Sequence, residues 1–260
     1  MNVNTRLERY GPWAVVTGAS DGIGREFART LAAEGFKLVL VARREAHLRA
    51  LAAELPTESR VLALDLSRDE DLSALLAATR GLELGLLVAA AGFGTSGAFI
   101  ENDLGDELPM IDVNVRAVAS LSHHYGKAFA QQRRGGLVLF SSLLAFQGVP
   151  RAANYAATKA WVQTFAEGLA IELAPFGVDV LACAPGPIRT GFEARADMKM
   201  SMALEPSAVA RASLDALPRR GTVRPGWLSK VLEWSLMFLP RWGRVRVLQQ
   251  VMAGMTRHQS

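Results

Sequence analysis

Three side chains near the middle of the sequence could together move a proton to or from a carbonyl group. Tyr155 and Lys159 lie four positions apart in the stretch N-Y-A-A-T-K-A, and Ser142 lies thirteen residues before the tyrosine. On a helix, residues at i and i+4 leave the same face about 6 Å apart, so the Lys159 ammonium can act on the Tyr155 phenol. A neighbouring cation lowers the pKa of a tyrosine from its ordinary value of about 10 toward the range in which general acid–base catalysis works.

A glycine-rich stretch near the N-terminus could hold the phosphates of a dinucleotide. The apolar run 13–16 leads into T-G-A-S-D-G-I-G, which contains Gly18, Gly22 and Gly24, and a helix-compatible run follows. Glycine permits a positive φ and close approach of backbone N–H groups to a pyrophosphate, and a helix N-terminus adds partial positive charge. The spacing differs from the G-x-G-x-x-G fingerprint, so an ordinary strand–turn–helix connection remains the alternative at this point.

Together, the glycine stretch, Ser142 and the Tyr155–Lys159 pair resemble the short-chain dehydrogenase/reductase superfamily in order and spacing, over residues 10–190 of the chain. The resemblance implies that Ser142 polarises a substrate carbonyl and that Tyr155 exchanges the proton. It implies that Lys159 lowers the pKa of the tyrosine and bonds the nicotinamide ribose, and that Asn114, in D-V-N-V-R, holds a water in the proton relay. The neighbouring hydroxyl of Ser141 is expected to be structural.

The choice of nicotinamide coenzyme depends on charge at the end of the second predicted strand. In dinucleotide folds an acidic residue there bonds the ribose of NAD, whereas arginine accommodates the 2′-phosphate of NADP. After the apolar run 37–41 the sequence has Arg43 and Arg44 and no carboxylate. Because guanidinium groups bind phosphate bidentately, we expect NADP(H), with Arg43 as the main contact and Ser20 and Arg44 as helpers. Arg44 could instead be a solvated residue of the next helix.

The resemblance also assigns the remaining coenzyme contacts. Asp65 matches the position that bonds the adenine, and the Pro-Gly turn of P-G-P-I-R-T, residues 185–190, matches the segment that holds the nicotinamide carboxamide. The family's usual Asn-Asn-Ala-Gly is replaced by A-A-A-G over 89–92, so we expect weaker bracing of the central sheet without loss of chemistry. The expected coenzyme-binding residues are Gly18, Ser20, Gly22, Ile23, Gly24, Arg43, Asp65, Leu66, Ala91, Gly92, Tyr155, Lys159, Pro185, Gly186, Ile188 and Thr190.

The elements that must position these residues alternate along the chain. Apolar runs near 13–17, 37–42, 60–65, 84–90, 136–141 and 178–184 are separated by stretches of helical period over 22–34, 44–55, 68–80, 106–133, 152–174 and 206–217. This alternation predicts an α/β fold, a Rossmann-type doubly wound parallel sheet with helices on both faces. We expect an NADP(H)-binding and catalytic domain over 1–218, with 219–260 as a basic and apolar helical extension of the same domain.

The cysteine and histidine content points to a protein without disulfides or a metal. Cys183 is the single cysteine, and its apolar setting indicates a buried strand thiol in a reducing compartment. The N-terminal stretch lacks the apolar core of a secretory signal, so we expect a cytoplasmic location. The histidines, at positions 47, 123, 124 and 258, show no metal-ligand spacing, and we expect no metal.

The basic character of the chain belongs to its C-terminal part. Residues 219–260 carry eight Lys or Arg against one Glu, whereas the whole chain has a net charge of +4. The apolar stretch 227–239 is interrupted by Lys230, Glu233 and Pro240, so it falls short of the ~20 apolar residues that cross a bilayer. Two interpretations of 227–248 stay open: peripheral membrane contact through its Trp and Arg residues, or a helix that packs over the substrate cleft or a neighbouring subunit. No nucleic-acid motif accompanies the charge.

The substrate is expected to be lipophilic. The segment 192–204 should form a mobile flap, and its Met198, Met200 and Met202 would adapt to irregular apolar shapes, although they could equally face the core. We expect an NADPH-dependent oxidoreductase that interconverts a lipophilic ketone or aldehyde and a secondary alcohol. The alternatives are a non-catalytic NADP(H)-sensing regulator or scaffold and isomerase-type chemistry. The resemblance implies a homodimer or homotetramer formed through the helices 106–133 and 152–174.

Overall fold

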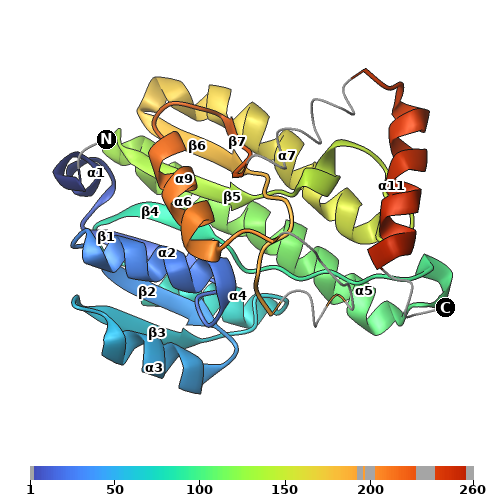
Figure 1. Cartoon of the computed structure of the whole chain (residues 1–260). Coiled ribbons are helices and arrows are strands. Elements are labelled where there is room, and N and C mark those ends of the chain that lie inside the picture. Colours follow the sequence, from blue (N-terminus) through green and yellow to red (C-terminus); the bar gives the residue numbers. More distant parts are fainter. Residues whose placement is uncertain (1–2, 192–195, 197–202, 227–237, 256–260) are drawn as a thin grey trace.

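A seven-stranded parallel sheet forms the centre of the molecule (Figure 1). The computed structural model describes residues 3–191, 196, 203–226 and 238–255. The strands are β1 (Trp13–Thr17), β2 (Lys37–Ala42), β3 (Ser59–Ala63), β4 (Leu84–Ala89), β5 (Gly135–Phe140), β6 (Val178–Cys183) and β7 (Thr222–Val223). Their order is β3-β2-β1-β4-β5-β6-β7, so the winding direction reverses between β1 and β4. Ligands bind outside the carboxyl ends of the strands at such a switch point. The predicted doubly wound sheet is confirmed.

Helices cover both faces of the sheet and bury two separate cores. They are α2 (Gly22–Ala33), α3 (Glu45–Glu54), α4 (Asp69–Ala78), α6 (Ala117–Gln132), α7 (Ala153–Leu173) and α9 (Pro206–Ala216). The core on one face joins the strands to α2, α3 and α9, and the core on the other face joins them to α4, α6 and α7. Successive strand residues face opposite cores, as Val15 and Val16 do in β1. Because both faces are covered, the central strands can be apolar throughout.

The helix expected over 106–133 is confirmed in its extent, because the chain is helical over 104–132, but its hydrogen bonding is not regular throughout. The chain forms α5 (Leu104–Ile111), a π-helical turn η2 (Asp112–Arg116) and then α6. Pro109 lies inside α5 and has no N–H to donate, so a regular hydrogen-bond ladder cannot run through it. Asn114 lies in the π-helical turn, a feature that is frequent at functional sites.

Several elements lay beyond the sequence prediction. Helix α1 (Val3–Tyr10) packs against the amino ends of the strands, where the fully buried Tyr10 donates a hydrogen bond to Asp179 Oδ2 at 2.6 Å. Short 3₁₀ turns occur at η1 (Phe99–Glu101), η3 (Leu143–Phe146) and η4 (Ala174–Phe176). Helix α11 (Arg241–Met255), by contrast, lies within the helical extension expected over 219–260, and it stands at the right of the sheet in Figure 1.

Some sequence predictions fall on residues outside the described part of the chain. These are the flap methionines Met198, Met200 and Met202 and the apolar stretch 227–237. Among the described residues, no helix combines the length and the apolar character needed to cross a bilayer. The division of the chain at 218/219 stays a prediction.

Candidate active site

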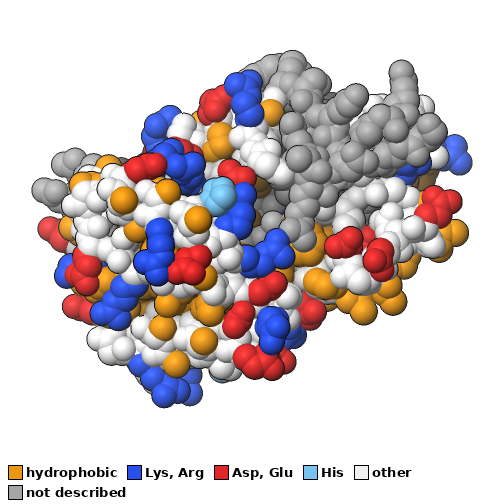
Figure 2. All heavy atoms as spheres, turned by 90° about the horizontal axis from the view of Figure 1, so that it is seen from below, with side chains coloured by type: hydrophobic (Ala, Val, Ile, Leu, Met, Phe, Trp, Pro, Cys, Tyr) orange, Lys and Arg blue, Asp and Glu red, His pale blue; other side chains and the backbone are white. Residues whose placement is uncertain are grey.

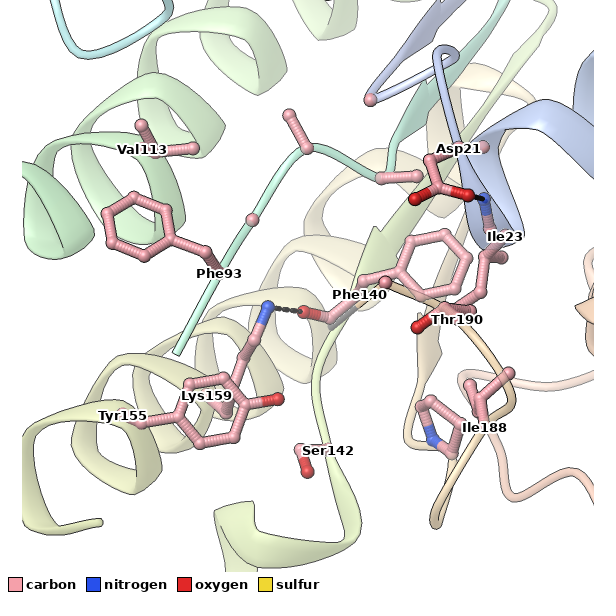
Figure 3. A pocket seen from close by; sticks show the side chains of 18 of the residues that line it. Asp21, Ile23, Phe93, Val113, Phe140, Ser142, Tyr155, Lys159, Ile188 and Thr190 are labelled. Carbon is pink, nitrogen blue, oxygen red and sulfur yellow. Dashed lines mark hydrogen bonds between the residues drawn. The ribbon is translucent and has the colours of Figure 1, made fainter. Parts of the chain in front are cut away.

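A cavity of about 1020 Å³ opens at the carboxyl ends of the strands. It is lined by every residue expected to bind the coenzyme and by Ser142 (Figure 3). In Figure 3, Tyr155, Lys159 and Ser142 lie on one side of the cavity, and Asp21, Ile23 and Thr190 lie on the other. Asn114 is the exception among the predicted site residues, because it is buried behind the cavity wall. Residues from widely separated parts of the chain therefore meet in one place.

Helix α7 presents Tyr155 and Lys159 on the same face, one turn apart. Both side chains are buried, and the Lys159 Nζ lies 5.8 Å from the centre of the Tyr155 ring. The ammonium donates a hydrogen bond to the Phe140 carbonyl oxygen at 2.9 Å, which Figure 3 shows as a dashed line. Because Phe140 ends β5, this bond holds the lysine between the sheet and the tyrosine.

The two serines that follow β5 have different environments. Ser142 Oγ accepts a hydrogen bond from the Leu144 N–H at 3.2 Å, and its side chain lines the cavity. Ser141 Oγ donates to the Lys159 carbonyl oxygen at 3.1 Å and so ties β5 to α7. This bond is structural, as expected for Ser141, and leaves Ser142 as the hydroxyl beside Tyr155.

Asn114 braces the wall of the site. Its Oδ1 accepts from the Phe93 N–H at 3.2 Å, and its Nδ2 donates to the Phe93 carbonyl at 2.9 Å and to Thr158 Oγ1 at 3.1 Å. Gly92 is packed between Asn114 and the lysine, because a Cβ there would lie 2.9 Å from Asn114 Oδ1 and 3.3 Å from Lys159 Nζ. The amide therefore links the loop after β4 to α7, and its part in a proton relay stays a prediction.

The electrostatics of the tyrosine differ from the sequence prediction. Burial raises the pKa of Tyr155 to about 12, and a hydrogen bond with Ser142 offsets only part of that increase. Burial also lowers the pKa of Lys159 to about 8, with the Cys183 thiol acting in the opposite direction. In the protein by itself the pKa of Tyr155 is thus raised, and not lowered as the spacing of the lysine predicts. The reason is that both groups are desolvated together, which disfavours both charges.

The glycine stretch has the geometry of a phosphate cradle. Gly18 has a φ of +69°, and a Cβ there would lie 2.8 Å from the Ala90 carbonyl oxygen. A Cβ on Gly24 would lie 2.4 Å from the Gly18 carbonyl oxygen, so α2 could not approach β1 with a larger residue. The first residues of α2, Gly22, Ile23 and Gly24, line the cavity. Backbone N–H groups and partial positive charge at this position suit a pyrophosphate.

Asp21 is a site residue that sequence reasoning did not single out. Its Oδ1 accepts from the Gly22 N–H at 2.7 Å and caps α2. Its Oδ2 lies 3.5 Å from Arg44 Nη2, and the same guanidinium donates to Ser20 Oγ at 3.2 Å. Asp at a helix N-cap is a recognisable signal, so the residue could have been found from its position before the helix.

Arg43 and Arg44, the two arginines expected to bind a 2′-phosphate, line the cavity directly after β2. Arg43 and Arg44 are about half exposed, and Arg43 Nη1 lies 3.7 Å from Asp65 Oδ2. Burial acts to raise the pKa of Asp65, but hydrogen bonds from Ser67 and the Arg43 charge outweigh it, so this pKa is lowered. Asp65 is therefore a carboxylate that pairs with Arg43 in the cavity lining, and its contact with an adenine stays a prediction. The residues present fit an NADP-type coenzyme.

The missing asparagines of the A-A-A-G segment are partly compensated. Thr17 Oγ1 accepts from the Ala91 N–H at 3.0 Å and contacts the Val88 carbonyl oxygen at 3.5 Å. This hydroxyl joins the ends of β1 and β4 at the switch point. Weaker bracing of the central sheet by the A-A-A-G segment stays a prediction, and Thr17 is the side chain that joins the two strands there.

A comparison with known proteins identifies the family. The family model described as short chain dehydrogenase matches residues 12–200 of this chain. The chain belongs to the short-chain dehydrogenase family. Family relatives include a 7beta-hydroxysteroid dehydrogenase from Clostridium sardiniense, 33% identical over 231 residues that cover 86% of this chain and 88% of that protein. A very-long-chain 3-oxoacyl-CoA reductase from Podospora anserina is 33% identical over 250 residues, which cover 88% of this chain and 73% of that protein.

Solved structures of the short-chain dehydrogenase family share the whole fold. A 7beta-hydroxysteroid dehydrogenase structure matches with a TM-score of 0.84 at 28% identity and covers 95% of this chain and 99% of its own. A short-chain dehydrogenase from Sphingobium yanoikuyae in complex with NADPH has a TM-score of 0.79 at 30% identity, with coverages of 89% and 97%. A 3-ketoacyl-(acyl-carrier-protein) reductase from Brucella melitensis complexed with NADH has a TM-score of 0.75 at 27% identity, with coverages of 85% and 99%.

Helix α11 covers the cavity of this short-chain dehydrogenase. Its apolar residues Val247, Leu248, Val251, Met252 and Met255 line the cavity. Leu248 and Met252 are buried in a small core with residues 149, 152 and 156, at the start of α7. Of the two interpretations of the C-terminal part, packing over the cleft therefore applies to α11. Residues 227–237 lie outside the described part.

Glu107 is a buried carboxylate beside the site that sequence reasoning missed. Its Oε1 accepts from Thr95 Oγ1 and from Asn102 Nδ2, both at 2.7 Å, and its Oε2 accepts from Asn154 Nδ2 at 2.6 Å. Burial acts to raise the pKa of Glu107, but these three hydrogen bonds outweigh it, so the pKa is lowered. Because Asn154 precedes Tyr155, Glu107 fastens the loop after β4 and α5 to the start of α7. This role could not be predicted from the sequence, because a single Glu in a helical stretch is usually a solvated residue.

Proposed function

We propose that this chain is an NADPH-dependent oxidoreductase that interconverts a lipophilic ketone or aldehyde and a secondary alcohol by hydride transfer. The observation that carries the proposal is the meeting of Ser142, Tyr155 and Lys159 with the glycine cradle in one cavity. An acid–base tyrosine beside a phosphate-binding turn serves a redox reaction on a carbonyl, whereas a sensor of NADP(H) has no need of that tyrosine. The family and its named relatives support the same reaction class.

The coenzyme, when bound, supplies or accepts the hydride. In the proposal, the turn that contains Gly18, Gly22 and Gly24 holds its pyrophosphate, and Arg43 binds the 2′-phosphate. Lys159 bonds the ribose, and the segment from Pro185 to Thr190 holds the carboxamide. Preference for NADP over NAD is supported by the two arginines after β2, since related structures contain either form.

The protein groups move the proton. In the proposal, Ser142 donates a hydrogen bond to the carbonyl oxygen and Tyr155 donates the proton, while Asn114 and Lys159 support its replacement. With a pKa of about 12, Tyr155 is protonated at neutral pH, which is the form that a proton donor requires. The protein by itself therefore holds Tyr155 in the form that can give a proton to a carbonyl oxygen.

A lipophilic substrate is supported by the apolar walls around the catalytic groups. Phe93 and Val113 line one part of the cavity, and the apolar side chains of α11 line another. A concave, mostly apolar surface with a few polar groups is the usual setting for a small hydrophobic ligand. The steroid and acyl substrates named for the relatives are also lipophilic.

The test is a panel of ketones and aldehydes, measured through the absorbance of NADPH with wild type and Tyr155→Phe. We expect bulky hydrophobic ketones to be reduced, and Tyr155→Phe to lose turnover by about 10³-fold or more while it still binds NADPH. The matched control is Tyr125→Phe, another buried tyrosine whose hydroxyl lies 3.0 Å from Thr79 Oγ1 and outside the cavity. Full activity of Tyr155→Phe, or NADPH binding without reduction of any carbonyl, would favour the sensor alternative.

We also propose that the protein is a cytoplasmic homo-oligomer. Leu104, Leu108 and Ile111 form an exposed apolar ridge on α5. Viewed from below, apolar side chains gather at the right-hand end of the molecule, the end that carries α5 (Figure 2). Apolar patches of this kind support association with another chain. Light scattering on the purified protein would decide, since a monomer mass at micromolar concentration contradicts this part of the proposal.

Peripheral membrane contact through 227–248 stays a prediction. The exposed Trp242 and Arg246 of α11 are consistent with contact to lipid headgroups. Flotation of the protein with anionic vesicles, compared with Trp242→Ser, would test it. Absence of the wild-type protein from the lipid fraction would refute it.

A further inference from the structure

One side chain in the substrate part of the cavity has a polar group without a partner. Gln147 is only 7% exposed and lines the cavity. Within the described ranges, no residue forms a hydrogen bond with its side-chain amide. A glutamine amide offers two donors on Nε2 and an acceptor on Oε1, so several bonds could be made there.

The surroundings of Gln147 are apolar. The residue follows the turn η3, whose Leu143 and Leu144 also line the cavity. Two positions later, Val149 is buried in the core that contains Leu248 and Met252 of α11. A Cβ on Gly148 would lie 3.8 Å from Val245 Cγ2, so the segment 147–149 runs directly beneath α11. Gln147 therefore adds an amide to a cavity that is also lined by Ser142 and by apolar side chains.

Such an amide needs an explanation. Most buried polar side chains are hydrogen-bonded, and the exceptions mark functional positions or unseen partners. The amide atoms of Gln147 are not among the fully buried polar atoms that lack a partner in the described part of the chain, so they open onto the cavity. The neighbouring Leu, Val and Met side chains cannot pair with them. A ligand that enters the cavity and brings its own oxygen would form the missing bonds.

We propose that Gln147 binds a second oxygen of the substrate, a neutral hydroxyl or carbonyl separate from the one that reacts. The inference rests on the proposed function, because it concerns the substrate of that reaction. A neutral amide matches a neutral oxygen, whereas a carboxylate or phosphate would call for a cation. The substrate is thus a lipophilic carbonyl compound with two oxygen functions, either a ring ketone with a further hydroxyl or an acyl chain with a second carbonyl.

We expect the protein to distinguish strongly between substrates with and without the second oxygen. A site that is built to hydrogen-bond a substrate oxygen rejects the analogue that lacks it, because the site's polar group is then left unpaired. We expect the oxygenated member of a pair to be favoured by about 10²-fold in kcat/KM. Replacement of the amide by the thioether of methionine, which has a similar length, should remove this preference.

The experiment uses two pairs of ligands and three forms of the protein. One pair is a polycyclic ketone with and without a second hydroxyl, and the other is a 3-oxoacyl thioester and a chain ketone without the second carbonyl. The forms are wild type, Gln147→Met and Gln249→Met, an exposed glutamine on α11 outside the cavity lining that serves as the matched control. Wild type and Gln249→Met should prefer one or both oxygenated ligands, and Gln147→Met should lose that preference. The pair that shows it identifies the source of the oxygen.

A binding measurement separates this inference from the proposed reaction. The dissociation constants of the same pairs are measured by calorimetry on Tyr155→Phe with NADPH, with and without Gln147→Met. If wild type reduces none of the ketones, the proposed function fails, but the ratio of dissociation constants still tests the amide. Equal affinity for both members of each pair, or no binding of either, overturns the role of Gln147. Thermal unfolding checks the folding of Gln147→Met, and we expect no loss of stability because no bond of the native protein is removed.

Discussion

The three tyrosines of the chain allow a direct measurement of how the active-site phenol ionises. All three are buried, and burial raises the pKa of each: Tyr125 and Tyr155 to about 12, and Tyr10 further still. In the unfolded chain all three should ionise near their ordinary value of about 10. The perturbation is therefore an alkaline titration of the folded protein.

The fraction of Tyr155 that is ionised differs widely between a site in which burial sets the pKa and one in which Lys159 sets it. A pKa of about 12 leaves roughly one Tyr155 in a thousand ionised at about pH 9. If Lys159 instead lowered the pKa to about 7, then ~99% of Tyr155 would be tyrosinate at about pH 9. The shift from 10 to about 12 corresponds to about 3 kcal/mol in favour of the neutral phenol.

The assay follows the near-ultraviolet absorbance of tyrosinate against pH for wild type and Tyr155→Phe. The denatured chain supplies the amplitude for three tyrosines. We expect no tyrosinate signal from either folded form below about pH 9. A signal of one tyrosine below that pH, present in wild type and absent from Tyr155→Phe, would refute the argument from burial. It would show that the lysine dominates, as the spacing alone predicts.

The same pKa values have a consequence for stability. The raised pKa of Tyr155 favours the folded state at any pH below the unfolded value of about 10. That contribution is lost as the pH rises from about 10 through 12, because the unfolded chain then releases its protons first. Tyr125 acts in the same direction, so we expect unfolding in alkali to begin in this window.

Three further substitutions test other parts of the site. Lys159→Met should abolish most turnover yet raise the free energy of unfolding at pH 7, because burial lowers the lysine pKa from 10.5 to about 8 and so disfavours its charged form. That advantage should shrink between pH 8 and 10.5, where the wild-type lysine becomes neutral, and chemical denaturation at several pH values measures it. Arg43→Ala should weaken NADPH by about 10-fold or more and NADH little, by fluorescence titration, and equal losses would contradict the 2′-phosphate assignment. Gly92→Ala should lower turnover by about 10- to 100-fold, since the new Cβ would lie 2.9 Å from Asn114 Oδ1 and must displace it. Gly168→Ala is its control, because a Cβ there meets nothing within 4 Å, and similar losses in both variants would contradict the packing argument.

The chemistry of this protein could be recognised from short stretches of sequence. The spacing of Tyr155 and Lys159 is a property of one helix, and the glycines of the phosphate cradle are required by one turn. Alternating apolar runs similarly predict a parallel sheet, because a strand covered on both faces is apolar along its whole length. These features depend on neighbours within about one or two turns of the chain, so a local pattern is enough to show them.

Other features required the folded chain, because they depend on residues far apart in sequence. Asn114 is 44 residues from Thr158, its partner on α7, and Glu107 is 47 residues from Asn154. The covering of the cavity by α11 brings residue 248 against residue 149. A local sequence pattern cannot predict such contacts, because many sequences with the same spacing of apolar residues would pack differently.

The protonation state of Tyr155 and Lys159 is the clearest example of a property that the sequence alone could not predict. Helical spacing places a cation beside the Tyr155 phenol, and this alone predicts a lower pKa. Whether the cation or the burial prevails depends on how much water both groups lose. That follows from the packing of Phe93, Met110 and Val113 around Tyr155 and of β5 against Lys159. Residue types and spacing name the reacting groups, whereas their desolvation, which only the tertiary structure creates, sets the form in which they react.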